Sequence, residues 1–151
     1  MKIILDQIAE FDAVLSAGHL HISEIFPLFD EAITRGVKRR VVTHPTYTLD
    51  ATITDITELA QNGSYIEHSL CMFIDESRFK KWTPEQLKAV ILAGTVDKTI
   101  LGSDLGQIKN PTPVTGFKAV IRDCISQGFS DDDIRKLVGG NATKLLGIDK
   151  V

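Results

Sequence analysis

Hydrophobic residues recur along this chain at two alternating spacings. Runs of adjacent apolar residues, typical of buried strands, alternate with segments in which apolar residues return every three or four positions, as in helices. The pattern predicts four strands at about residues 12–20, 37–43, 64–70 and 97–104. It predicts helices at about residues 2–10, 23–35, 54–61, 84–94 and 117–127, and two short ones that begin at Ser130 and Asn141.

Capping residues mark several of the expected helix starts. Thr83 and Gln86 have the spacing of a capping box, which satisfies free backbone N–H groups at a helix start. Ser23 is expected to cap the helix of residues 23–35. The glycines at 139–140 indicate a helix break, after which Asn141 is expected to cap the last helix.

The predicted strands end at three histidines and one aspartate: His19, His44, His68 and Asp104. The intervals between them have the length of a strand plus a helix, and tight hairpin sequences are missing between the strands. Repeated βα units of this kind imply a parallel sheet with right-handed crossovers. We therefore expect an α/β fold in which four βα units form one parallel sheet.

Composition narrows the functional classes. The 151 residues are 43% hydrophobic and 25% charged, as expected for one globular domain covering residues 1–151. The net charge of -3 and the lack of a basic run argue against a nucleic-acid partner. No apolar stretch has the length of a membrane span or signal peptide, so a cytoplasmic protein is expected. Cys71 and Cys124 lie in apolar segments and are expected to be reduced core residues.

Strand ends that carry histidine and aspartate predict a metal site. The carboxyl ends of parallel strands meet at one edge of a sheet, so His19, His44, His68 and Asp104 can converge. Imidazole and carboxylate groups suit zinc, iron or manganese. Such an ion lowers the pKa of its bound water to about 7. A neighbouring carboxylate can then act as a general base.

Several candidates also have a purely structural explanation. His44 precedes a proline and could simply end a strand, and Asp104 could only form a turn. His21 forms a His-x-His pair with His19, but one of the two could face solvent. Glu67 and His68 are adjacent in a predicted strand, so their side chains point to opposite faces and only one can reach the site.

Four segments together resemble the second half of a metal-dependent hydrolase of the amidohydrolase superfamily. They are Ala17-Gly18-His19, Val42-Thr43-His44-Pro45, Leu101-Gly102-Ser103-Asp104 and residues 134–147. The resemblance implies half of a (β/α)8 barrel in which His19 and His44 bind the metal. It also implies that Asp104 is the metal-linked acid that takes a proton from the attacking water. We expect His68 to assist catalysis, and Glu67 and His21 to bind the substrate.

The resemblance covers nearly the whole chain but only half of the barrel. The family's metal-binding His-x-His pair on strand one has no counterpart, and neither has its bridging residue on strand four. The chain could be a fragment, could pair with a second copy to close a barrel, or could keep an open sheet with covered edges. The start inside a helix favours the first two accounts, and a homodimer or higher homo-oligomer is expected.

The leading functional hypothesis is a metal-dependent hydrolase of a small molecule, or the C-terminal half of one. Metal-activated water would attack a C–N, C–O or P–O bond, with zinc as the first choice of metal and iron or manganese as others. The alternative is a non-catalytic half-barrel module that serves oligomerisation or small-ligand binding.

Overall fold

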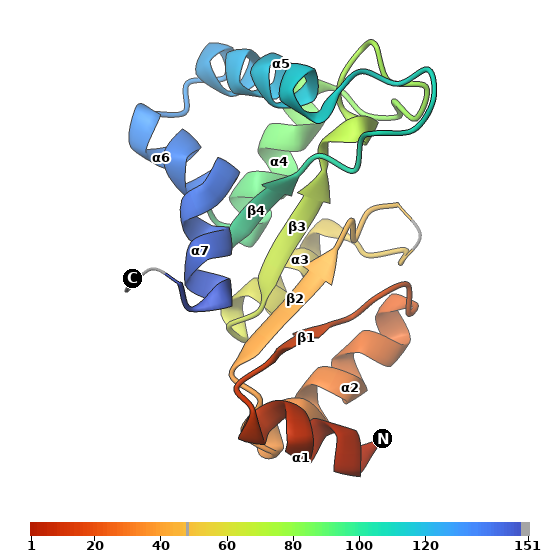
Figure 1. Ribbon diagram of the computed structural model, residues 1–151, viewed down its shortest axis with the longest axis vertical. Helices are drawn as coiled ribbons and strands as arrows, with labels where there is room; N and C mark the ends of the chain where they lie inside the picture. The colour runs from red at the N-terminus through yellow and green to blue at the C-terminus, as the bar shows by residue number, and fades with distance from the viewer. Residues whose placement is uncertain (48, 149–151) are drawn as a thin grey trace.

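A computed structural model of the protein describes residues 1–47 and 49–148. Its centre is a sheet of four parallel strands in the order β1-β2-β3-β4 (Figure 1). The strands are β1 (Val14–Ser16), β2 (Arg39–Thr43), β3 (Tyr65–Ser69) and β4 (Thr99–Gly102). The α/β class with four βα units is confirmed, although the first strand is much shorter than the pattern predicted.

Helices precede the sheet, connect its strands and follow it. The α-helices are α1 (Lys2–Glu10), α2 (Ile22–Thr34), α3 (Ile53–Gln61), α4 (Pro84–Gly94), α5 (Pro113–Ser126), α6 (Asp131–Arg135) and α7 (Asn141–Leu146). A 3₁₀ turn, η1 (Leu70–Met72), follows β3, and a π-helical segment, η2 (Lys136–Gly140), joins α6 to α7. Among the described residues, no helix combines the length and apolar character needed to span a membrane.

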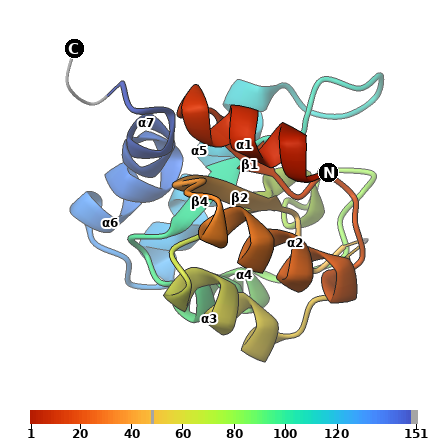
Figure 2. The same cartoon turned by 90° about the horizontal axis from the view of Figure 1, so that it is seen from below.

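The main core lies between one face of the sheet and α2, α3 and α4. Val42, Ile66 and Leu101 project from that face and are almost fully buried with the apolar sides of the three helices. Figure 2 shows these helices together on one side of the sheet, with α1 and α7 on the other. Cys71 and Cys124 are free and buried in this core, as the sequence predicted.

The last helix, α7, lies against the opposite face of the sheet. Leu145 of α7 is buried against Val41 and Ile100, near the amino ends of the strands. This leaves the carboxyl ends of the strands on that face for the site described below.

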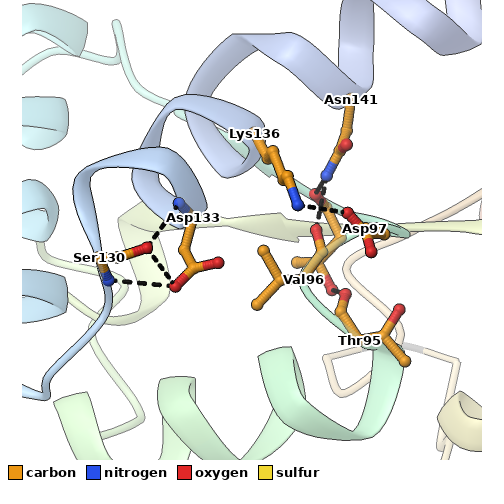
Figure 3. Close-up of polar contacts among 8 residues, drawn as sticks. Thr95, Val96, Asp97, Ser130, Asp133, Lys136 and Asn141 are labelled. Atoms are coloured by element: carbon orange, nitrogen blue, oxygen red, sulfur yellow. Dashed lines mark hydrogen bonds and ion pairs between the residues drawn. The ribbon is translucent and has the colours of Figure 1, made fainter.

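Asn141, the first residue of α7, anchors that helix to β4 and is not the helix cap that the sequence predicted. Its side-chain amide donates hydrogen bonds to the backbone oxygens of Val96 and Thr99, both at 2.7 Å (Figure 3). The backbone stays helical from Arg135 to Asn141, so the expected break at residues 139–140 does not occur. The buried carbonyl oxygens beside β4 need a donor, and the Asn141 amide supplies it.

Two other predicted caps were tested by the structure. Thr83 and Gln86 form the expected capping box of α4. The cap of α2 is His21 and not Ser23: the Nδ1 atom of His21 accepts a hydrogen bond from the Ser23 backbone, and Glu24 accepts one from the His21 backbone. An imidazole nitrogen can accept a hydrogen bond as a serine oxygen does, so α2 begins earlier than predicted.

Candidate functional site

His19 and His44 meet at the carboxyl ends of β1 and β2. Their Nε2 atoms are 3.2 Å apart, and their rings stack with centroids 4.9 Å apart and an angle of 22° between the planes. The two residues are distant in sequence, and the parallel sheet brings them together as the sequence predicted. The same nitrogen of each ring therefore points toward one place.

The backbone is in the left-handed region at His44 and at Asp104. Their φ angles are +35° and +45°, values that few residues other than glycine adopt and that cost about 1–2 kcal/mol each. At His44 the chain leaves β2 in a turn, in which the Tyr47 backbone N–H donates to the His44 carbonyl at 3.0 Å. These turns aim both side chains at the region beyond the strand ends.

Four of the predicted site residues line one open hollow of about 420 Å³. They are His19, His44, Glu67 and Asp104, and the remaining lining residues are Gly18, Thr43 and Ser69. The hollow collects side chains from all four strand ends. We refer to it below as the histidine hollow.

Glu67 is the most buried acid of the histidine hollow. Burial raises the pKa of its carboxyl group to about 7, and the nearby Asp104 charge adds to the rise, while a hydrogen bond from the His44 backbone opposes it. A Cβ atom at position 102 would overlap the Glu67 carboxylate, so glycine at the end of β4 makes room for it. Near neutral pH this carboxyl group is able both to donate and to accept a proton.

Burial also affects His44. It lowers the pKa of the imidazole, and the neighbouring His19 lowers it further, while the Asp104 charge opposes the change. The neutral ring is therefore favoured, and a neutral imidazole nitrogen is the form that binds metal ions or accepts protons.

The carboxylate of Asp104 is held by a residue that the sequence interpretation assigned only to the core. The Cys71 thiol donates a hydrogen bond to Asp104 Oδ2 at 3.5 Å. Burial raises the pKa of Cys71 to about 12, and the Asp104 charge adds to the rise, so the thiol stays protonated and remains a donor. The position of Cys71 just beyond the third strand was the available sequence signal.

His68 and His21 lie outside the histidine hollow. His68 projects from the helix-covered face of β3, is fully buried and packs edge-on against the Phe73 ring. Burial lowers its pKa to about 4. His21 is occupied in capping α2, and its Nε2 atom lies 3.9 Å from Asp50. Alternation along β3 thus turns Glu67, and not His68, toward the hollow.

Two histidines and an acid at one edge do not by themselves complete a metal site. Within residues 1–47 and 49–148, no group of three or more His, Cys, Asp or Glu side chains is arranged to hold a metal ion. His19 and His44 provide two converging imidazole nitrogens, and the carboxylates of Glu67 and Asp104 line the same hollow.

Comparisons with known proteins show which known structures share this fold. Residues 1–67, less than half of the chain, match a family of unknown function (DUF6282). No curated protein sequence matches the chain. A crystal structure of an amidohydrolase from Burkholderia multivorans with bound zinc matches 97% of this chain at a TM-score of 0.71 and 16% sequence identity. The fold is that of half an amidohydrolase barrel.

Two further solved structures agree. The same Burkholderia multivorans enzyme with bound HEPES matches 95% of this chain at a TM-score of 0.67 and 17% identity. A Pseudomonas putida protein named as a 2-pyrone-4,6-dicarboxylic acid hydrolase matches 97% at a TM-score of 0.59 and 15% identity. The half-barrel covers 56% of each of these chains, so it spans about half the length of the structures it matches. The predicted resemblance to part of such a barrel is confirmed at the level of fold.

Proposed function

We propose that this half-barrel is a metal-dependent hydrolase of a small molecule, or the C-terminal half of one. The observation that carries the proposal is the 3.2 Å separation of the Nε2 atoms of His19 and His44. Two nitrogens that bind one tetrahedral zinc at 2.0–2.1 Å are about 3.3 Å apart. The histidine pair therefore fits one zinc ion, and iron or manganese are the other candidates.

The side chains around the pair have separate roles in the proposal. A bound divalent ion would supply an activated water for attack on a C–N, C–O or P–O bond. Asp104 would accept the proton of that water, with its carboxylate positioned by the Cys71 thiol. Glu67, on the same side of the sheet, would hydrogen-bond the substrate. His68 and His21 have no part, because neither lies in the histidine hollow.

The first experiment is elemental analysis of protein purified without an affinity tag or chelator. We expect about one zinc, iron or manganese ion per chain, and hydrolysis of at least one compound in a panel of esters, amides and phosphoesters. His19→Ala and His44→Ala should lose both properties. His21→Ala, which removes an exposed histidine outside the hollow, should keep both. The proposal fails if the protein takes up no metal from excess ion, or if the two alanine variants behave as the wild type.

The second candidate is a non-catalytic half-barrel module for oligomerisation or ligand binding. It is favoured by the finding that the described residues contain no arranged group of three metal-ligating side chains. A protein that binds no metal and hydrolyses nothing in the panel would support this candidate over the first.

We also propose that a second copy of the chain completes the barrel. Within the described sheet, β1 and β4 each pair on one side only, which leaves two strand edges open to another chain. Helix α1 packs beside β1 through Leu5, yet Ile4 of this helix and Phe11 just after it are 58% and 75% exposed. A twofold arrangement would pair β4 of each copy with β1 of the other, and it would cover the open side of both histidine hollows.

A further inference from the structure

A cavity of about 440 Å³ opens between α3 and α4, on the helix-covered side of the sheet. One wall is the loop after β2 and the start of α3, with Thr46 and Ile53, and the other is α4 and the segment before it, with Trp82 and Val90. The two helices lie side by side (Figure 2). Within the described part of the chain, no residue lines both this cavity and the histidine hollow. We call it the helix pocket.

Apolar side chains form most of the helix pocket. Phe73 and Val90 belong to the buried core and line the pocket together with the Trp82 ring. Ile53 lines the same space, yet it is 50% exposed although it is a large aliphatic residue. An apolar body that fills the pocket would remove this side chain from water, which favours binding.

Hydrogen bonds hold the walls of the helix pocket in place. Capping boxes fix the first turns of both α3 and α4. In the loop after β2, the Ala51 backbone N–H donates to the Pro45 carbonyl at 3.2 Å. The Leu49 carbonyl accepts from the Ile22 backbone N–H at 2.9 Å, and the Leu49 side chain is fully buried. The pocket is therefore formed in advance, which lowers the cost of binding.

Two polar atoms in the lining residues of the helix pocket have no hydrogen-bond partner. Within residues 1–47 and 49–148, the Nε1 atom of Trp82 and the Oγ1 atom of Thr46 are buried and unpaired. The other uncharged polar side chains of the lining, Thr52 and Gln86, both take part in capping boxes. Since buried polar groups are nearly always hydrogen-bonded, the two unpaired atoms indicate that a polar ligand atom binds here.

The chemistry of the lining limits what this ligand atom can be. The indole N–H of Trp82 only donates, so its partner must accept, whereas the Thr46 hydroxyl can do either. Asp50 is the one charged side chain among the described lining residues, and its carboxylate repels an anionic ligand. A hydroxyl group meets both conditions, because it is uncharged and can accept from the indole while it donates to the threonine oxygen.

The volume sets the size of the ligand. A cavity of about 150 Å³ is enough for benzene, so about 440 Å³ accommodates two fused rings. We propose that the helix pocket binds a small uncharged alcohol with an apolar body of this size. In the complex, the Trp82 and Thr46 side chains turn slightly and direct their unpaired atoms at the ligand hydroxyl. This ligand site is additional to the proposed hydrolase site and does not depend on it.

The test is a titration of the full chain with 2-indanol, followed by ¹⁵N NMR. Trp82 is the only tryptophan of the chain, so its indole N–H gives a single signal. This signal should move saturably, with the proton shifting downfield as the N–H gains an acceptor. Indane, which has the same rings without the hydroxyl, should bind about fivefold more weakly and cause no downfield shift. Indane-2-carboxylate should also bind more weakly, because Asp50 repels it. An indole signal that does not respond to 2-indanol, or equal affinity for indane, would overturn the proposal.

Variants locate the bound alcohol. Thr46→Val replaces the hydroxyl with a methyl group and should weaken 2-indanol binding about fivefold without changing indane binding. Thr34→Val, the same change at an exposed position at the end of α2, should have no effect. Ala89→Phe, at an exposed position of α4, fills the pocket and should abolish binding of both compounds. Unchanged 2-indanol binding in Thr46→Val or in Ala89→Phe would show that the ligand lies elsewhere.

His19→Ala separates this proposal from the proposed function. The variant lacks one of the two converging imidazoles but keeps the helix pocket, so it should bind 2-indanol as the wild type does. Loss of 2-indanol binding in this variant would place the ligand in the histidine hollow and overturn the helix pocket. If the wild type neither holds metal nor hydrolyses the panel while 2-indanol still binds as expected, the proposed function fails and the helix pocket stands.

Discussion

Glu67 and His68 are adjacent in β3, and burial acts on them in opposite ways. Removing a group from water disfavours its charged form, so burial raises the pKa of the acid and lowers that of the base. Alternation in the sequence predicted that the two side chains would point apart, but it could not tell which one faces the site. The pairing of Glu67 with Ile100 decides this, because Ile100 lies on the face that α7 covers. Register between distant strands is not readable from either strand alone.

His68 should make the protein less stable as the pH falls. Its pKa is about 4 in the folded chain and about 6.5 when unfolded, so between these values only the unfolded state takes up the proton. Above about pH 6.5 the low pKa of His68 does not affect the free energy of unfolding, and below that pH the free energy of unfolding falls. The difference in free energy of unfolding between His68→Leu and the wild type should therefore shift by about 2 kcal/mol in favour of the variant when the pH is lowered from 7 to 4.5. Urea unfolding at both pH values measures this, and an equal difference at the two would contradict it.

Gly102 should be required for the position of the Glu67 carboxylate. In Gly102→Ala the new methyl group would overlap that carboxylate, which is the mobile end of a side chain and can move away. We expect a loss of stability of about 1 kcal/mol and a loss of hydrolysis of about tenfold, similar to that of Glu67→Gln. Thermal unfolding and turnover of the best panel substrate measure the two effects. Gly139→Ala is the control, since a Cβ atom there meets no neighbour within 4 Å. Full turnover in Gly102→Ala would argue against a role for Glu67.

At the scale of elements, periodicity and caps predicted most of the fold. The strands β2, β3 and β4 and the helices between them appear where the apolar spacing placed them. The errors concern Ser23, His21 and Asn141, whose polar side chains can serve either as caps or in other contacts. The choice depends on which buried backbone groups lie nearby in space. In the case of Asn141, those groups lie about 45 positions earlier in the chain.

Asn141 should therefore be important for stability although it is remote from the histidine hollow. Its replacement by alanine leaves the carbonyl oxygens of Val96 and Thr99 without their donor. Since an unsatisfied buried polar group costs about 1–3 kcal/mol, Asn141→Ala should lose about 2–4 kcal/mol in urea unfolding. Asn62→Ala, at an exposed position after α3, should change stability by less than about 0.5 kcal/mol. A comparable small change in Asn141→Ala would mean that water satisfies these oxygens.

At the scale of the whole molecule, the described sheet has one open edge at β1 and another at β4. The histidine hollow is open, the described residues provide no third arranged metal ligand, and the matched structures are nearly twice as long. The βα intervals of the sequence predicted the parallel sheet, and the resemblance to the amidohydrolase superfamily implied that this sheet is half of a barrel. It could not identify what lies beside the open edges, because no pattern within one chain specifies the surface of another.

The proposal that a second copy completes the barrel sets the mass that the protein should have in solution. The chain has a mass of 16.6 kDa, so light scattering after gel filtration should give twice that value, about 33 kDa. Phe11→Glu places a charge at the exposed apolar residue that follows α1 and should produce a folded monomer with reduced metal content. Ile53→Glu, at an exposed apolar position of α3, should remain a dimer, because α3 connects the two inner strands β2 and β3. A wild-type monomer at all concentrations tested would rule out the second copy. A monomer that still holds one metal ion per chain would show that the histidine hollow works without a partner.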